Sequence, residues 1–290
     1  MPKFDYIYPK LPPDPFEDNE EEDIQLAKEP EQPKPKKKNK NLALIAGGLA
    51  FFTGIAVIAM IIILVSYFSD LDSSERLSQN LRQQFEYYVH NNETITVNED
   101  GTMPLAASPA EEFTFYSPFD VEMRRHNPNY VAWITIPGTS ISYPVVRYTD
   151  NYRYLDVAFD GSHSSFGTIF MDYRNRGDFV PHIIMYGHNT YHGNMFSDLH
   201  LLLEPGFRSR NNRIMLLVNG RIVEFEIFAA RRTTIHDRAY FLDFTDEEAW
   251  SDYLRRIGAP ADVRQILTLS TCIIVRDPSR RVVVQAFLVE

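Results

Sequence analysis

Short apolar stretches alternate with polar turns over the second half of the chain. Each stretch is rich in β-branched or aromatic residues, which favours strands. The Asn219-Gly220 pair is typical of a two-residue hairpin turn, here between two of these strands. Eight short strands with few helices predict a mainly β domain whose sheet closes into a barrel with helical insertions. The expected strands are Val131–Ile136, Tyr143–Val146, Thr168–Met171, Ile183–Tyr186, Arg213–Val218, Ile222–Ala229, Gln265–Leu269 and Val282–Val289.

Helical periodicity is confined to a few segments. Phe119–His126, Met195–Leu203 and Asp246–Ile257 fit as insertions, the last with Thr245 as its N-cap and acidic residues in its first turn. Before the barrel, Asp70–Asn92 predicts a helix with Ser73 or Ser74 available as a cap. Its apolar residues recur at helical spacing, at Leu77, Leu81, Phe85 and Tyr88.

One segment is apolar throughout. Residues 42–68 carry no charge and are long enough to cross a hydrocarbon core of ~30 Å as a helix. A secretory signal is the alternative, but some 40 residues precede this segment, which is typical of an internal anchor rather than a signal. Lysines cluster just before it and Asp70 and Asp72 follow it, so the positive-inside rule predicts a cytoplasmic N-terminus and an extracellular C-terminal domain.

These patterns divide the chain into four parts. We expect a disordered cytoplasmic tail at 1–41, a transmembrane helix at 42–68, an extracellular juxtamembrane helix and linker at 69–112, and a mainly β domain at 113–290. The tail holds ten acidic and eight basic residues and few apolar ones. The formal net charge of −10 and the lack of a basic patch predict that the chain does not bind nucleic acid.

The single cysteine, Cys272, follows the apolar run Arg264–Leu269 in the sequence Thr-Leu-Ser-Thr-Cys. We interpret the Ser-Thr-Cys step as the exit of a strand. One cysteine forms no intramolecular disulfide and is too few for a cysteine-based metal site. A small buried hydrophobe is the plain alternative to a nucleophile. In an extracellular, oxidising setting, however, an idle thiol is a liability, and this favours chemistry.

A reactive thiol needs a proton acceptor and often a cation nearby. Among the eight histidines, His188 is distinctive because it follows the strand Ile183–Tyr186 and thus ends a second strand, as Cys272 does. A surface or capping histidine is the alternative. Arg280 and Arg281 precede the last strand and could place a cation for a developing oxyanion, or could merely charge a strand edge.

The motifs Thr-Leu-Ser-Thr-Cys, Tyr-Gly-His-Asn and an arginine before a valine-rich last strand resemble the sortases, the cysteine transpeptidases of Gram-positive cell surfaces. Several further segments resemble class B sortases. They are Asn127–Thr139, Asp150-Asn151 followed by Tyr154-Leu155, Phe159–Gly161, Gly167–Phe170, Asp172–Asn175 and the helix Asp246–Ile257. The resemblance runs from about Phe119 to Glu290.

The resemblance implies a role for each matching residue. Cys272 would be the nucleophile that holds substrate as a thioester, His188 the proton shuttle, and Arg281 the oxyanion ligand. Asn151, Tyr186, Ser270 and Thr271 would line the peptide groove. It implies neither a metal nor another cofactor. Strand alternation alone does not choose between Arg280 and Arg281, since both faces of the last strand are largely apolar. The family register places Arg281 in the catalytic position.

By this resemblance the protein is a membrane-anchored cysteine transpeptidase. It would cleave a C-terminal sorting signal of the Asn-Pro-x-Thr-x or Leu-Pro-x-Thr-Gly type at the Thr–X bond and transfer the protein to an amine of a peptidoglycan precursor, lipid II. The alternatives are a pilin-polymerising sortase, a secreted thiol endopeptidase with water as acceptor, and a catalytically silent binding domain tethered to the plasma membrane.

Overall fold

The computed structural model describes residues 40–91, 117–176, 180–273 and 277–289. Of the tail expected at 1–41, residues 1–39 lie outside the described residues, and so does the linker part of the expected segment 69–112, at 93–112. The long helix α1 (Lys40–Asn91) crosses the boundary between two compact units of the chain, Met1–Ala56 and Val57–Glu290. The second unit contains the β-domain.

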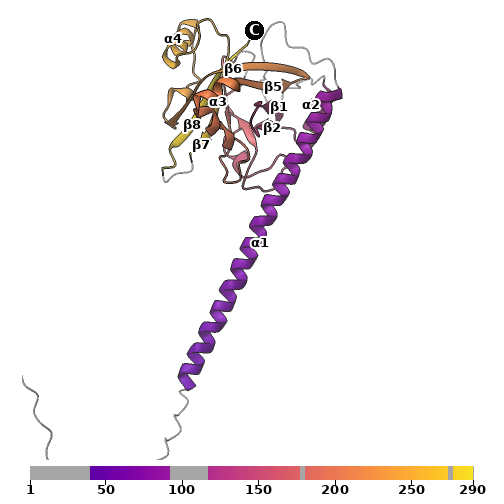
Figure 1. The fold of residues 1–290 in the computed structure, drawn as a ribbon, viewed down its shortest axis with the longest axis vertical. Coiled ribbons are helices and arrows are strands. Elements are labelled where there is room, and N and C mark those ends of the chain that lie inside the picture. Colours follow the sequence, from indigo (N-terminus) through magenta and orange to yellow (C-terminus); the bar gives the residue numbers. More distant parts are fainter. Residues whose placement is uncertain (1–39, 92–116, 177–179, 274–276, 290) are drawn as a thin grey trace, which may run out of the picture. The chain divides into compact units, whose positions relative to one another are not determined.

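The β-domain is a closed barrel (Figure 1). Its strands follow the order β1-β2-β3-β4-β7-β8-β6-β5, and β5 pairs with β1 to close the sheet. This confirms the predicted fold class. The bounds are β1 (Tyr130–Thr135), β2 (Ser142–Arg147), β3 (Ile169–Met171), β4 (His182–Tyr186), β5 (Arg213–Val218), β6 (Arg221–Thr234), β7 (Ile266–Cys272) and β8 (Arg280–Leu288).

Turn chemistry sets the register of the sheet at one clear point. Val218 pairs with Arg221, so Asn219 and Gly220 alone form the hairpin loop between β5 and β6. Both adopt positive φ, 52° and 76°, as a primed turn requires, and this confirms the predicted hairpin. Strand β6 runs well past the predicted end at Ala229, because its second half pairs with β8 beyond a register shift between Ile227 and Ala229.

Two strands that lie far apart in the sequence are parallel neighbours. Strand β4 pairs with β7 from His182 opposite Ile266 to Tyr186 opposite Ser270. Their C-terminal ends therefore emerge at the same rim of the barrel. The interpretation of Ser-Thr-Cys as a strand exit was wrong: β7 continues to Cys272, because these three residues pair with the start of β8.

The helical insertions differ from prediction at their ends. The helix α2 (Pro118–His126) matches the predicted segment within a residue. Helix α4 (Glu247–Ile257) is capped by Asp246, whose carboxylate accepts from the Ala249 N–H, so the prediction of Thr245 as cap was wrong by one residue. The helix predicted to start at Met195 starts two residues later, as the 3₁₀ helix η2 (Ser197–Leu203). Met195 itself has a φ of 56° and forms a β-bridge with Asn189, so it is not helical.

Three short helices were not predicted. They are η1 (Arg153–Leu155), α3 (Pro205–Arg210) and η3 (Arg238–Tyr240). Each spans six residues or fewer, too short for an apolar periodicity to stand out in the sequence.

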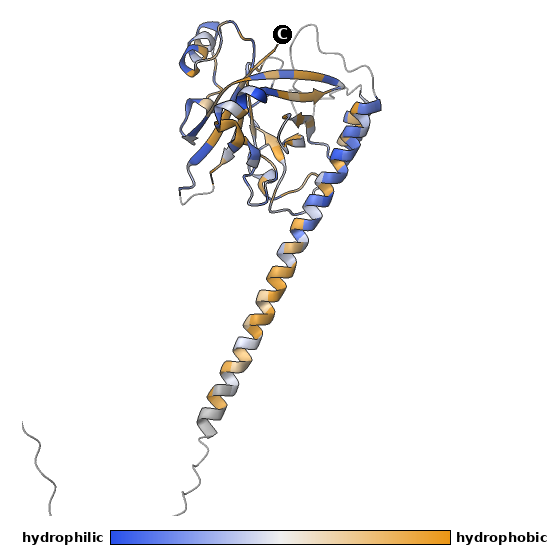
Figure 2. Cartoon of the chain, in the orientation of Figure 1, coloured by the Kyte–Doolittle hydropathy of each residue, from blue (hydrophilic) through white to orange (hydrophobic). Residues whose placement is uncertain are grey.

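Helix α1 has no break between its apolar and polar parts. No helix N-terminus occurs at Ser73 or Ser74, so the predicted cap there was wrong; the Ser73 hydroxyl donates to the Asp70 carbonyl within the helix. Within α1, one stretch is long and apolar enough to cross a membrane, and its apolar side chains are exposed. Figure 2 shows this apolar stretch giving way to a hydrophilic C-terminal part.

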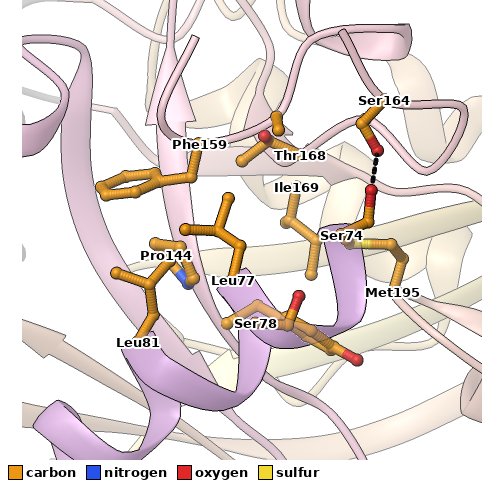
Figure 3. Close-up of a pocket in the computed structure, with 13 residues that line it drawn as sticks. Ser74, Leu77, Ser78, Leu81, Pro144, Phe159, Ser164, Thr168, Ile169 and Met195 are labelled. Atoms are coloured by element: carbon orange, nitrogen blue, oxygen red, sulfur yellow. Dashed lines mark hydrogen bonds between the residues drawn. The ribbon is translucent and has the colours of Figure 1, made fainter. Parts of the chain in front are cut away.

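The C-terminal part of α1 packs on the outside of the barrel. Leu77 and Leu81 point toward the β2 and β3 region, and Ser74 forms a buried hydrogen bond of 2.7 Å with Ser164 (Figure 3). Further along, the ring of Phe85 stacks on Trp133 with a centroid distance of 4.8 Å. The periodicity that predicted this helix is therefore the face that binds the barrel.

A substitution in this face should weaken the domain. Leu81 is 4% exposed, and Leu81→Ala should lower the free energy of unfolding by about 2 kcal/mol or more, since it removes buried methyl groups and leaves a cavity. Tyr87→Ala, on the same helix at 73% exposure, should change it by less than about 0.5 kcal/mol. Urea unfolding of the detergent-solubilised chain measures both. Equal effects would contradict this packing.

Candidate active site

A cleft of about 460 Å³ opens at the rim where β4 and β7 end. Its walls come from these two strands, the start of β8, and the segments around η1 and η3. The lining residues are Asn151, Tyr152, Leu155, Phe170, Arg174, Tyr186, Gly187, His188, Ile235, Tyr240, Ser270, Thr271, Cys272 and Arg281.

Cys272 and Arg281 are cross-strand partners. Cys272 is the last residue of β7, and its register partner on antiparallel β8 is Arg281. Directly opposed residues on antiparallel strands project from the same face, with Cβ atoms ~5 Å apart. Arg281 therefore faces the thiol side of the sheet, and its Nη1 donates to the carbonyls of Pro278 (2.6 Å) and Arg280 (2.9 Å). Arg280 lies on the other face, 3.7 Å from the carboxylate of Asp277.

His188 enters the cleft from the neighbouring parallel strand. Tyr186 pairs with Ser270. Beyond this pair, the Gly187 N–H donates to the Ser270 carbonyl, and the Thr271 hydroxyl donates to the Gly187 carbonyl. This places His188 at the rim beside the end of β7. Its Nε2 lies 2.8 Å from the Leu155 carbonyl, so we assign the proton to Nε2.

Two other histidines lie close by but differ in environment. His182 is fully buried, and burial lowers its pKa to about 4. Its Nδ1 donates to the Phe241 carbonyl, and its Nε2 accepts from the Thr268 hydroxyl. It is a neutral core residue. His200 is half-buried, and its Nε2 lies 2.9 Å from Nδ2 of Asn189, which also donates to the Cys272 carbonyl.

The groove side chains hold one another in place. The Ser270 hydroxyl bonds to the Tyr240 hydroxyl at 2.8 Å, and the Tyr240 ring stacks on Tyr186. Ser270 and Thr271 are each only 2% exposed, so their hydroxyls serve the wall of the cleft. Burial raises the pKa of Tyr240, and the nearby positive charge of Arg281 opposes that rise.

A buried carboxylate, Asp172, lies behind the part of the cleft wall that Asn151, Arg174 and Tyr186 form. Asp172 accepts hydrogen bonds from the Asn151 amide (3.1 Å), the Tyr186 hydroxyl (2.8 Å) and the Arg174 guanidinium (2.9 Å at each oxygen). Burial of Asp172 opposes its ionisation, but the bonds from Arg174 and Tyr186 outweigh that effect and hold its pKa below the usual 3.8. Asp172 thus fixes the position of three side chains that line the cleft.

A cysteine, a histidine and an arginine therefore line one cleft, at the ends of three adjacent strands. The comparisons with known proteins agree with this geometry. A model of the Sortase domain family matches residues 134–289. This chain belongs to the sortase family.

The most similar relatives place it in class B. It is 32% identical to the sortase B of Listeria monocytogenes and 30% identical to that of Staphylococcus aureus, each over 179 residues that cover 58% of this chain and 73% of the relative. The structure of the Staphylococcus aureus sortase B–substrate complex superposes with a TM-score of 0.61 at 26% identity, over 76% of this chain and 98% of that one. The chain is accordingly a sortase transpeptidase.

All seven residues that the sequence assigned to the site of this sortase line the cleft. Sequence reasoning missed Tyr240 and Arg174. Arg174 lies in the Asp172–Asn175 segment that already resembled class B sortases, so its motif was visible but its contact with the cleft was not. Tyr240 belongs to a short 3₁₀ helix with no sequence signal. Among the described residues, no cluster of three or more His, Cys, Asp or Glu side chains could hold a metal ion.

Asp172 yields a pH-dependent prediction. Asp172→Asn loses the ionic pair with Arg174 and should lower the free energy of unfolding by about 2 kcal/mol at pH 7, the scale of a hydrogen bond to a charged group. The native carboxyl has a depressed pKa, so its contribution is complete above 3.8 and is lost as the pH falls through the folded-state pKa.

Denaturant unfolding from pH 7 to pH 2.5 should therefore show the two chains converge only in acid. Asp160→Asn, at an exposed loop position whose carboxylate bonds only to the neighbouring Ser162, is the matched control and should change stability little. A gap between wild type and Asp172→Asn that persists undiminished at pH 2.5 would show that ionisation of Asp172 is not its source.

Proposed function

We propose that this sortase cleaves a C-terminal sorting signal at a Thr–X bond and transfers the acyl product to an amine. The observation that carries the proposal is the placement of Cys272 directly opposite Arg281, with His188 at the end of the adjacent strand, in one open cleft. These three side chains supply a nucleophile, a cation and a proton carrier for acyl transfer.

In the first half-reaction, His188 takes the proton of the Cys272 thiol, and the thiolate attacks the carbonyl carbon of the signal threonine. The resulting oxyanion is stabilised by the Arg281 guanidinium, which backbone carbonyls hold in position before substrate arrives. As the tetrahedral intermediate collapses, the C–N bond breaks, and His188 protonates the departing amine. The product is a thioester between the threonine carbonyl and Cys272.

In the second half-reaction, an acceptor amine attacks the thioester carbonyl and loses a proton to His188. The C–S bond breaks, a new amide forms, and Cys272 is released for the next cycle. With water as the attacking group the same steps give hydrolysis, which is the endopeptidase alternative. Occupation of the cleft by the acceptor decides between the two outcomes.

The resemblance to class B sortases guides the proposal for the substrates. The staphylococcal structure is a sortase B–substrate complex, and this supports a peptide lying along the cleft wall that Asn151, Tyr186, Ser270 and Thr271 line. We propose an Asn-Pro-x-Thr-x or Leu-Pro-x-Thr-Gly signal on a secreted surface protein as donor. The proposed acceptor is a peptidoglycan-precursor amine, as on lipid II. A pilin lysine as acceptor is the second candidate.

The apolar part of α1 supports attachment to the plasma membrane. The lysine-rich segment before it and Asp70 and Asp72 after it favour a single pass with a cytoplasmic N-terminus, by the positive-inside rule. The barrel then acts on the extracellular side, where secreted proteins and lipid-linked precursors meet.

An acceptor-dependent cleavage assay tests the proposal. A panel of peptides with the two signal types is incubated with the full chain, with and without triglycine or diaminopimelate, and products are identified by mass spectrometry. We expect ligated product that requires Cys272 and disappears in Cys272→Ala. Hydrolysis alone in the presence of every amine would establish the endopeptidase, and failure of a thiol-directed vinyl sulfone to label Cys272 would favour the silent binding domain.

The two arginines provide a matched pair of variants. Arg281→Ala should lower the transpeptidation rate by about 10²-fold or more, the usual effect of losing an oxyanion ligand. Arg280→Ala, on the other face and 58% exposed at its side chain, should lower it only several-fold. Neither change should alter stability much. Steady-state kinetics with one signal peptide and one amine measure both, and a dead Arg280 variant beside a near-normal Arg281 variant would mean that the cation acts from the opposite face.

A further inference from the structure

We propose that the loop Asn189–Asn194 rests on the headgroup layer of the membrane that α1 crosses. The inference deepens the proposed function and rests on the membrane attachment proposed above. It assigns a lipid-facing surface to the barrel itself, next to the catalytic histidine. The interaction partner is the extracellular bilayer surface.

The distance along α1 places the barrel at the membrane. The apolar run ends at Phe68, and α1 touches the barrel almost at once: the Tyr67 hydroxyl lies 3.3 Å from Nε2 of His192. Asp70 accepts from the N–H and the hydroxyl of Ser165, at 3.1 and 2.7 Å. With a rise of 1.5 Å per residue, these contacts lie within about 3 Å along the axis of the end of the apolar run. A headgroup layer is about 5–7 Å thick, so both barrel loops reach it.

The docking of α1 is firm enough to hold this position. Beyond Asp70, the buried bond between Ser74 and Ser164 ties the same barrel loop to the helix (Figure 3). Two turns further on, Arg82 donates to the Ser140 carbonyl at 3.1 Å and lies over the ring of Tyr143. The helix is continuous through these contacts, so the barrel follows any fixed depth of α1 in the bilayer.

The composition of the loop suits a headgroup layer. Asn189-Thr190-Tyr191-His192-Gly193-Asn194 contains no acidic residue that an anionic lipid would repel. Tyr191 is 85% exposed, the most exposed aromatic side chain of the barrel among the described residues. A tyrosine with an apolar ring and a polar tip is the kind of side chain that collects at membrane interfaces.

The loop is also tied to the reaction centre at both ends. It starts directly after His188, and the Phe196 N–H donates to the His188 carbonyl at 2.9 Å, while Asn189 bridges to Met195. When this loop lies at the headgroups, the His188 side of the cleft therefore faces amines that protrude from the bilayer. A lipid-linked acceptor would approach the thioester from that side.

Site-specific labels test the placement. In a Cys272→Ser background the full chain holds no other thiol, so Tyr191→Cys can carry a single environment-sensitive fluorophore. Ser251→Cys, at an exposed position on α4, is the matched control. Both are placed in liposomes whose lipids carry a nitroxide on the headgroup. We expect quenching at position 191 to exceed that at 251 at least three-fold.

An insertion tests the cause. Seven alanines between Phe68 and Ser69 add about two helical turns and lift the barrel by roughly 10 Å while nearly preserving its rotation. Quenching at 191 should then fall to the level at 251. Unchanged quenching after the insertion, or equal quenching at 191 and 251 without it, would overturn the inference.

Two further readouts separate this inference from the proposed function. Flotation with liposomes tests attachment independently: a chain that floats but shows no difference between the labels refutes only the loop surface, and a chain that does not float refutes both. In an active chain, Tyr191→Glu should leave ligation to soluble triglycine unchanged and slow ligation to a lipid-linked amine several-fold. Equal slowing with both acceptors would place Tyr191 in the cleft and overturn its membrane role.

Discussion

The parallel pairing of β4 with β7 is the constraint on which the site depends. These strands are separated by about 80 residues of chain, yet their register from His182–Ile266 to Tyr186–Ser270 brings two C-terminal ends to one rim. Parallel strands carry their ends in the same direction, so residues that follow each strand must meet. Barrel closure then adds β8 on the far side of β7 and brings in the arginine. The backbone hydrogen bonds of the sheet thus bring the three residues to one rim.

This arrangement explains why the supporting contacts lie behind the cleft. The Thr271 hydroxyl and the Asn189 amide donate to backbone carbonyls at the ends of the two strands, and so hold His188 and the end of β7, which carries Cys272, in a fixed relative position. Asp172 likewise holds the side chains of Asn151 and Tyr186 in position by accepting a hydrogen bond from each. A cleft open to solvent gains its order from buried polar groups that are fully paired, since unpaired ones would cost free energy.

Sequence reasoning reached the strands and the reactive residues because both leave local signals. Short apolar runs rich in β-branched or aromatic residues marked the strands, and the Asn-Gly turn fixed one hairpin. The choice of Arg281 over Arg280 was different, since alternation left it open and only the family register favoured one; the observed pairing with Cys272 now gives the geometric reason for Arg281 to face the cleft. The place of Tyr240 in the cleft could not be predicted from the sequence, because its hydrogen bond to Ser270 depends on how the 3₁₀ helix η3 lies against β7. The prediction of a helix cap at Ser73 or Ser74 was wrong because it depended on where the helix starts. A serine caps a helix only at its N-terminus, and α1 does not start at Ser73.

The uninterrupted helix α1 links the proposed membrane segment directly to the barrel. In a chain with a flexible joint after Phe68, the barrel would sample many orientations and the cleft would have no fixed height above the bilayer. Here no proline or glycine separates the apolar part of α1 from the face that packs on Trp133, and the Asp70 and Ser74 contacts follow within two turns. With the membrane attachment proposed above, a rigid connection would convert the depth of the helix in lipid into a position of His188 relative to the surface. In the proposed reaction, that fixed geometry would favour attack on the thioester by an amine held at the membrane over attack by water from the bulk.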